Sequence, residues 1–131
     1  MNEIRKQLSV FLENRPGVLA RVCSILSDAG INLLAIAIHD TVDNAVVRFL
    51  PDNPSKALLL LEREEFYVLE QNVLMIEIQN HAGELTRICQ SLAEADINIS
   101  YAYCTAKPDQ DACCLVIKAE DPERALEILT R

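Results

Sequence analysis

Apolar residues recur at two different spacings along the chain, and each spacing predicts one kind of element. Leu8, Val10 and Leu12 alternate with mostly polar neighbours, a period-two pattern that predicts a half-buried strand. From Gly17 the spacing changes to three and four, which predicts an amphipathic helix ending at Gly30. Its expected inward residues are Val18, Leu19, Val22, Cys23, Leu26 and Ala29.

The pattern then predicts a hairpin, a second helix and a long strand. Residues 31–38 and 45–50 are apolar runs joined by a polar turn at 40–44. Asn53 followed by Pro54 is typical of a capped helix start, and the apolar face of this helix comes from Ala57, Leu58, Leu60 and Leu61. Residues 66–78 contain no Gly or Pro and predict one long strand.

The second half of the chain repeats the first. Residues 80–98 match residues 14–32 at nine of nineteen positions without a gap. A helix is expected from Gly83, with Leu85, Ile88, Cys89, Leu92 and Ala95 inward, then a strand over 97–104, a turn over 105–111 and a strand over 112–119. Asp121-Pro122 predicts a last capped helix.

Each half therefore has the order β-α-β-β-α-β, which indicates an α+β fold of two ferredoxin-like units in tandem, with helices on one face of antiparallel sheets. We expect domains at 1–71 and 72–131. The second unit lacks its closing strand, because the sequence stops at Arg131 where that strand should begin. This leaves a sheet edge that is exposed or covered by something else, such as a symmetry partner.

Composition excludes several classes of function. A formal charge of −8 with scattered Lys and Arg argues against nucleic acid as a partner. No apolar run reaches the roughly 20 residues of a membrane span, and the polar start lacks the apolar segment of a signal peptide, so we expect a cytoplasmic protein with no membrane partner. The five cysteines are expected to be thiols.

We expect neither a metal site nor a cofactor. Cys104, Cys113 and Cys114 flank the second hairpin and could be considered as metal ligands or a redox pair. Adjacent strand residues point to opposite faces, so Cys113 and Cys114 cannot both face one ion, and no CxxC motif or nearby His completes a tetrahedral site.

The loop that opens the first helix is the best candidate for chemistry. A helix N-terminus offers free N–H groups and a positive dipole end, which suit a carboxylate or phosphate. Gly17 lets a ligand approach the backbone, and Pro16 stiffens the loop just before it. Asn14 and Asn32 can each offer donors and an acceptor, so the groups required by a zwitterion are present.

The segments Asn14-Arg15-Pro16-Gly17-Val18-Leu19 and Ala29-Gly30-Ile31-Asn32 resemble the ACT domain, and the whole chain is similar to a tandem pair of such domains. The resemblance implies a non-catalytic, amino-acid-sensing protein that binds a free amino acid between two ACT units. It also implies a homodimer and a regulated partner, such as an enzyme or regulator of amino-acid metabolism. The residues carried over are Asn14, Arg15, Pro16, Gly17, Val18, Leu19 and Asn32 in the first repeat, and Asn80, Gly83, Leu85 and Asn98 in the second.

The second loop departs from this pattern. Ala82 replaces the proline, and Glu84 lies in the first helical turn. A carboxylate there would compete with a bound anion for the same helix dipole. We therefore expect the first loop to bind more tightly than the second. His81, at the position of Arg15, could contact the side chain of a ligand.

Three other interpretations stay open. Asn-x-Pro-Gly is also an ordinary strand-to-helix turn, and Asn32 and Asn98 could simply satisfy backbone groups. Acylphosphatases share this fold order and use an Arg in the same loop, which Arg15 could imitate, but no catalytic motif supports an enzyme. A regulatory subunit that docks by a sheet edge without any small ligand is the third possibility.

Overall fold

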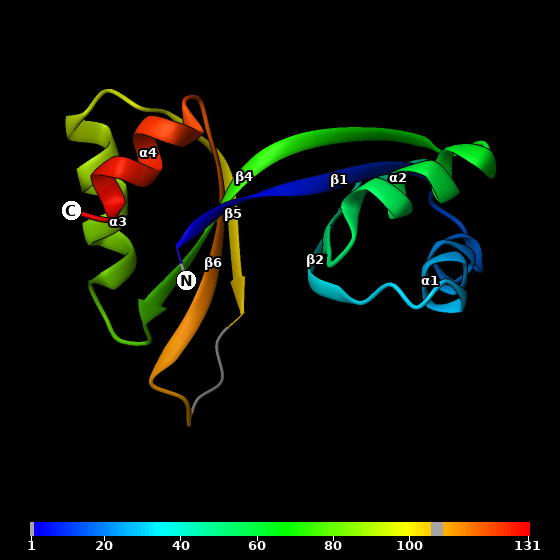
Figure 1. Cartoon of the computed structure of the whole chain (residues 1–131), viewed down its shortest axis with the longest axis horizontal. Helices are drawn as coiled ribbons and strands as arrows, with labels where there is room; N and C mark the ends of the chain where they lie inside the picture. The colour runs from blue at the N-terminus through cyan, green and yellow to red at the C-terminus, as the bar shows by residue number, and fades with distance from the viewer. Residues whose placement is uncertain (1, 106–108) are drawn as a thin grey trace. The chain divides into compact units, whose positions relative to one another are not determined.

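The computed structural model describes residues 2–105 and 109–131, so part of the turn predicted at 105–111 lies outside the described residues. Figure 1 shows the helices and strands along the chain. They are β1 (Glu3–Glu13), α1 (Val18–Asp28), β2 (Leu33–Asp40), β3 (Asn44–Pro51), α2 (Pro54–Arg63), β4 (Tyr67–Gln79), α3 (Glu84–Glu94), β5 (Ile99–Thr105), β6 (Ala112–Ala119) and α4 (Pro122–Leu129).

The chain forms two compact units, and β1 and β4 contribute to both. One unit is Lys6–Gln71, and the other combines the N-terminal residues through Arg5 with Asn72–Arg131. The first has the strand order β2-β3-β1-β4, and β3 pairs antiparallel with both β1 and β2. Its core lies between the sheet and helices α1 and α2. The core residues are Leu8, Val10, Leu12, Val22, Leu26, Ile31, Val47, Phe49, Ala57 and Leu61.

The other unit repeats this arrangement with helices α3 and α4. Its strands follow the order β1-β4-β6-β5, and β6 pairs antiparallel with both of its neighbours. Strand residues such as Ile76 and Leu115 pack with Ile88 and Leu92 of α3 in one buried cluster. The α+β fold of two ferredoxin-like units is thus confirmed.

No strand follows α4 among the described residues, and the chain itself covers the edge beside β4. The start of β1 belongs to this unit, and β1 is hydrogen-bonded to β4. Ile4 packs against the core of the unit, and the Asn2 Oδ1 accepts a hydrogen bond of 3.0 Å from the backbone N–H of Glu77. A symmetry partner is therefore not needed at this edge.

Local sequence signals explain the element boundaries. Asn53 Oδ1 accepts from the Lys56 N–H at 3.2 Å, and Asp121 Oδ1 accepts from the Arg124 N–H at the same distance, so both predicted caps are confirmed. The predicted strand over 66–78 is confirmed as the unbroken strand β4. No helix in the described part of the chain combines the length and apolar character that a membrane crossing requires.

Two predictions about buried faces were wrong. Leu85 and Cys89 were expected inward, but both are exposed, because α3 buries only Ile88 and Leu92. Cys89 is rotated about 100° from Ile88 around the helix, and Leu85 lies in the first turn, where the helix reaches the end of the core. In β1, Gln7 and Ser9 are buried, and both donate side-chain hydrogen bonds to the Gln71 Oε1.

Candidate functional site

The two loops that precede α1 and α3 have the same backbone. Gly17 and Gly83 cap these helices with φ of 89° and 93°, in the left-handed region that side-chain-bearing residues avoid. A Cβ added to either glycine would meet nothing within 4 Å. The requirement for glycine is therefore conformational, and the space beside each loop is open.

An asparagine side chain ties each loop to a neighbouring hairpin turn. The Asn14 Nδ2 donates to the carbonyl of Thr41 at 3.1 Å, and the Asn80 Nδ2 donates to the carbonyl of Gln110 at the same distance. The backbone N–H of Asn14 donates to Asp43 at 2.9 Å, and that of Asn80 to Asp111 at 2.8 Å. Both side-chain amides therefore already have a structural role.

The first turn of α1 keeps unpaired main-chain donors. The helix ladder begins with the Arg21 N–H, which donates to the Gly17 carbonyl at 3.0 Å. The Val18 N–H makes only a long 3.4 Å contact with the Arg15 carbonyl. Within residues 2–105 and 109–131, the N–H groups of Gly17, Leu19 and Ala20 have no acceptor. This helix end can therefore donate to an anion.

A cavity of about 560 Å³, here called the first cavity, lies beside this loop. The loop contributes backbone and side chains to one part of its wall, and the end of α2 with the start of β4 contributes another. Its lining residues are Phe11, Leu12, Glu13, Arg15, Pro16, Gly17, Val18, Arg21, Glu64, Glu65, Phe66 and Tyr67. Such a volume falls in the range of small-molecule sites.

Charged and aromatic groups alternate in the first cavity. The Arg15 Nε lies 2.6 Å from the Glu13 carboxylate, and the Arg21 Nη2 lies 3.0 Å from the Glu64 carboxylate. The Arg21 guanidinium also lies over the Phe66 ring, 5.1 Å from its centre. Each guanidinium is thus held in place by a carboxylate, and that of Arg21 also contacts an aromatic ring.

A second cavity of about 570 Å³ lies at the equivalent place in the other unit. Its lining residues are Asn2, Glu77, Ile78, Gln79, Glu84 and Thr130. Five of these positions correspond to lining residues of the first cavity 66 positions earlier, namely Phe11, Leu12, Glu13, Val18 and Glu64. Glu77 stands at the position of Phe11. The duplication therefore produced two cavities with different walls.

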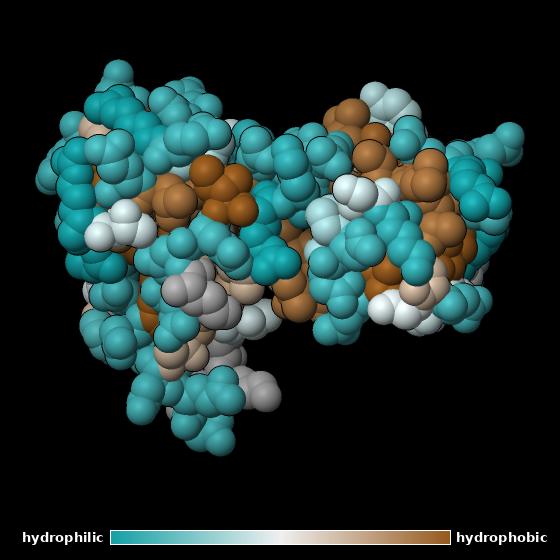
Figure 2. Space-filling view, viewed as in Figure 1, coloured by the Kyte–Doolittle hydropathy of each residue, from teal (hydrophilic) through white to brown (hydrophobic). Residues whose placement is uncertain are grey.

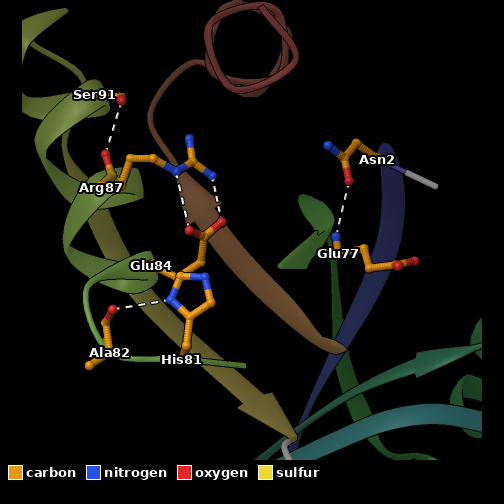
Figure 3. A network of polar contacts seen from close by, with 7 residues as sticks. All are labelled: Asn2, Glu77, His81, Ala82, Glu84, Arg87 and Ser91. Atoms are coloured by element: carbon orange, nitrogen blue, oxygen red, sulfur yellow. Dashed lines mark hydrogen bonds and ion pairs between the residues drawn. The ribbon is translucent and has the colours of Figure 1, made fainter. Parts of the chain in front are cut away.

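Glu84 occupies the first helical position of α3 and binds Arg87 within the same helix. Figure 3 shows the two side chains pointing toward each other, with Arg87 Nη2 and Nε at 2.8 and 3.4 Å from the two carboxylate oxygens. The hydrogen bond from Arg87 lowers the pKa of Glu84 below its usual value, although partial burial opposes this shift. The same hydrogen bond raises the pKa of Arg87. A permanent carboxylate thus lies where a bound anion would meet the helix dipole.

Asn32 and Asn98 do not line either of these two cavities. Each lies past the far end of the helix that its loop begins, about 16 Å along the axis for α1. The Asn32 carbonyl accepts from the Asp52 N–H at 2.9 Å, and its N–H donates to the Asp52 Oδ1 at 3.1 Å. The Asn98 carbonyl accepts from the Glu120 N–H at 3.2 Å. Within each unit these residues satisfy backbone groups.

Several residues of the first cavity were not identified from the sequence. They are Phe11, Arg21, Glu64, Glu65, Phe66 and Tyr67. The identity of Arg21 with Arg87 in the repeat was an available signal, because a shared Arg in the first helical turn suggests a role near the loop. Phe66 and Tyr67 gave no such signal, since they lie about fifty residues from the loop in the sequence.

The cysteines are dispersed in the described part of the chain. All five are free, and among the described residues no three His, Cys, Asp or Glu side chains come together as a ligand group. Cys114 pairs with Glu77 while its neighbour Cys113 pairs with Ile78, so the two thiols face opposite sides of the sheet. Burial raises the pKa of both thiols, which keeps them protonated at neutral pH.

Comparison with known proteins places the fold. The family model described as "ACT domain pair" matches residues 3–131. A solved protein from Bacteroides thetaiotaomicron is 30% identical, with a TM-score of 0.91, and the match covers 98% of this chain and 88% of that one. A regulatory subunit of aspartate kinase from Thermus thermophilus is 18% identical with a TM-score of 0.73, covering 98% and 95% of the two chains. The corresponding subunit from Thermus flavus is 16% identical with a TM-score of 0.66, covering 99% and 94%.

A comparison with curated protein sequences found no match. The family model covers almost the whole chain, and the repeated loops, helices and sheets agree with it. The chain therefore belongs to the ACT domain pair family.

Proposed function

We propose that the chain is a non-catalytic regulatory protein that binds a free amino acid at the first loop. The observation that carries this proposal is the set of unpaired N–H groups at the start of α1, where Gly17 and Val18 form part of the wall of the first cavity. These donors are held in place by Pro16 and by the tether from Asn14 to Thr41, so they need no rearrangement before a carboxylate binds.

The first cavity also offers groups for the ammonium of a zwitterion. Carboxylates of Glu13, Glu64 and Glu65 line the same cavity as the loop. Glu13 and Glu64 are each paired with an arginine. The ammonium group of a ligand would therefore interact with a carboxylate that is already part of an ion pair. Each charge-assisted hydrogen bond contributes about 1.5–3 kcal/mol, so a few such contacts suffice for a micromolar ligand.

Ligand occupancy would act on a partner in amino-acid metabolism. The structures of similar fold include regulatory subunits of aspartate kinase. By analogy, this chain would act on an enzyme or regulator, and the bound amino acid would alter how the subunits pair. The absence of any recognised catalytic motif in the sequence agrees with this role.

The edge strand β2 supports a homodimer. Its side chains Leu34, Ile36 and Ile38 are 41%, 44% and 51% exposed, and no charged residue lies between Leu33 and Ile38. Figure 2 shows apolar side chains, in brown, at the surface of the unit that contains β2. The equivalent positions of β5 carry Ser100, Ala102 and Cys104. An antiparallel pair of β2 strands from two copies would place these apolar side chains next to those of the other copy on one face of a continuous sheet, without opposing like charges.

The amino-acid proposal is tested by thermal unfolding in the presence of each of the twenty amino acids. A specific ligand should raise Tm by mass action, by an amount that grows with ligand concentration. No shift with any amino acid would contradict the proposal. Acylphosphate hydrolysis that disappears in Arg15→Ala would instead support an enzyme.

The dimer is tested separately by light scattering on the purified chain. Ile36→Lys should give a monomer, because it places a charge in the middle of the paired edge. Ala102→Lys introduces the same charge at the equivalent position of β5 and should leave the dimer intact. A wild-type monomer, or the same loss in both variants, would contradict the assignment of β2.

A further inference from the structure

We infer that the first cavity selects an amino acid with an aromatic or large aliphatic side chain, and that the exposed pair Phe11 and Tyr67 contacts that side chain. This inference rests on the proposed function and names the ligand class of the same site.

Aromatic rings at the first cavity are exposed to an unusual degree. Phe11 is 40% exposed and Tyr67 is 63% exposed, and both line the cavity. Their ring centres lie 5.1 Å apart with an interplanar angle of 58°, so they form one tilted aromatic pair. An aromatic pair left partly open to solvent gains most when a third apolar group covers it.

The Arg21 side chain brings a charged and an aromatic group together in the wall. Its guanidinium binds Glu64 with one nitrogen and lies over the Phe66 ring. Arg15, Gly17 and Val18 line the same cavity as the aromatic residues. A ligand with a charged head and an apolar side chain fits a cavity that offers both kinds of group.

The second cavity provides the contrast. Glu77 stands where the first cavity has Phe11, and none of the described residues that line the second cavity is aromatic. Glu77 and Glu84 line the second cavity with no arginine among its described lining residues, whereas Arg15 and Arg21 offset the glutamates of the first cavity. The same ligand would therefore bind the first cavity in strong preference to the second.

The experiment is isothermal titration of the full chain with L-phenylalanine, L-leucine, glycine and L-aspartate. We expect L-phenylalanine or L-leucine to bind at least about tenfold more tightly than glycine or L-aspartate, because only the first two cover the exposed rings. Equal or tighter binding of glycine or L-aspartate would overturn the selectivity and leave amino-acid binding itself in place. Binding of no amino acid would overturn both.

A pair of variants locates the contact. Tyr67→Ala should weaken L-phenylalanine binding about five- to tenfold through loss of one ring. Leu59→Ala is the matched control, since Leu59 is 60% exposed in the same unit but does not line the cavity, and its affinity should equal that of the wild type. Tyr67→Leu should restore part of the affinity. Unchanged affinity in Tyr67→Ala, or an equal loss in Leu59→Ala, would overturn the assignment of the rings.

Discussion

The loop at Asn14–Leu19 and the loop at Asn80–Leu85 have nearly the same backbone and very different side chains. The glycine φ angles differ by only a few degrees, at 89° and 93°. The bonds from Arg21 N–H to Gly17 and from Arg87 N–H to Gly83 are both 3.0 Å, and the asparagine tethers are both 3.1 Å. Duplication therefore preserved the geometry that presents main-chain donors.

One position decides what those donors face. With Val18 at this position, Arg21 binds Glu64 just past the end of α2, whereas Glu84 at the equivalent position binds Arg87 within its own helix. The side chain of Glu84 is only 14% exposed, so it fills space beside the helix end. The residue at this one position is apolar in the first loop and acidic in the second. It thus determines whether the helix end is open to anions or already carries a carboxylate.

The largest difference between the two loops is expected when each glycine is replaced by aspartate. Gly17→Asp should abolish the ligand-induced rise in Tm, because its carboxylate would repel the ligand at the open amides. Gly83→Asp should retain most of the rise. Both variants carry the same backbone strain of about 1–2 kcal/mol, since both glycines have left-handed φ and open space around Cβ. Gly83→Asp is therefore the matched control, and the reverse order would contradict the ranking of the loops.

A second substitution moves the acidic residue from one loop to the other. Val18→Glu should lower ligand affinity at least about tenfold, because the new carboxylate would draw Arg21 from Glu64 and repel the ligand. Titration calorimetry measures the change. Val18→Gln has the same shape without the charge and should bind more tightly than Val18→Glu. Equal affinities in these two variants would assign the effect to packing rather than charge.

Much of the fold was predictable, because spacing and capping are local properties of the sequence. The switch from period two to period three-and-a-half at Gly17, the Asn53-Pro54 cap and the unbroken run over 66–78 each determine an element from neighbouring residues alone. The sequence did not predict that the N-terminal residues cover the sheet edge beside β4 in the second unit. Asn2 and Glu77 are far apart in sequence, and no local pattern near residue 4 indicates that Ile4 packs in the second unit.

The candidate site was predictable only in its loop. The Pro-Gly pattern identifies Gly17 and the helix end, but Phe66 and Tyr67 reach the same cavity from a turn about fifty residues away. The Asn14 side chain was expected to be available to a ligand, yet it donates to Thr41, because a hairpin turn comes within reach only in the folded sheet. Non-local contacts of this kind decide which polar groups remain available.

A smaller effect is expected where the helices end. Gly30 has φ of 74°, and its repeat equivalent, Asp96, has φ of 59° and is exposed. Asp96→Gly should stabilise the chain by about 1 kcal/mol, and Gly30→Asp should destabilise it by a similar amount, because only glycine adopts this region without steric cost. Urea unfolding measures both through the midpoint at constant slope. Changes of the same sign in the two variants would contradict this explanation.

The smallest effect concerns the pH dependence of the Glu84–Arg87 pair. The pKa of Glu84 is lower in the folded chain than its ordinary value of 4.5, so its ionised form stabilises the fold above that pH. This stabilisation is lost as the pH falls through the folded-state pKa. Glu84→Gln should therefore unfold at a slightly lower urea concentration than the wild type at pH 7, and the difference should shrink as the pH falls below 4.5 and through the lowered folded-state pKa of Glu84. The effect is small because Arg87 is 55% exposed, and high salt should reduce it further.

Arg87→Gln provides the matched control for this last effect, because it removes the other half of the same pair. It should lower the midpoint at pH 7 by a similar amount, and the double variant should lose little more than either single variant, as expected for two residues that act through one interaction. Additive losses would show that Glu84 stabilises α3 through the helix dipole alone. In that case the two loops would differ only in the charge that Glu84 places at the start of α3. The ion pair between Glu84 and Arg87 would then not contribute to the difference.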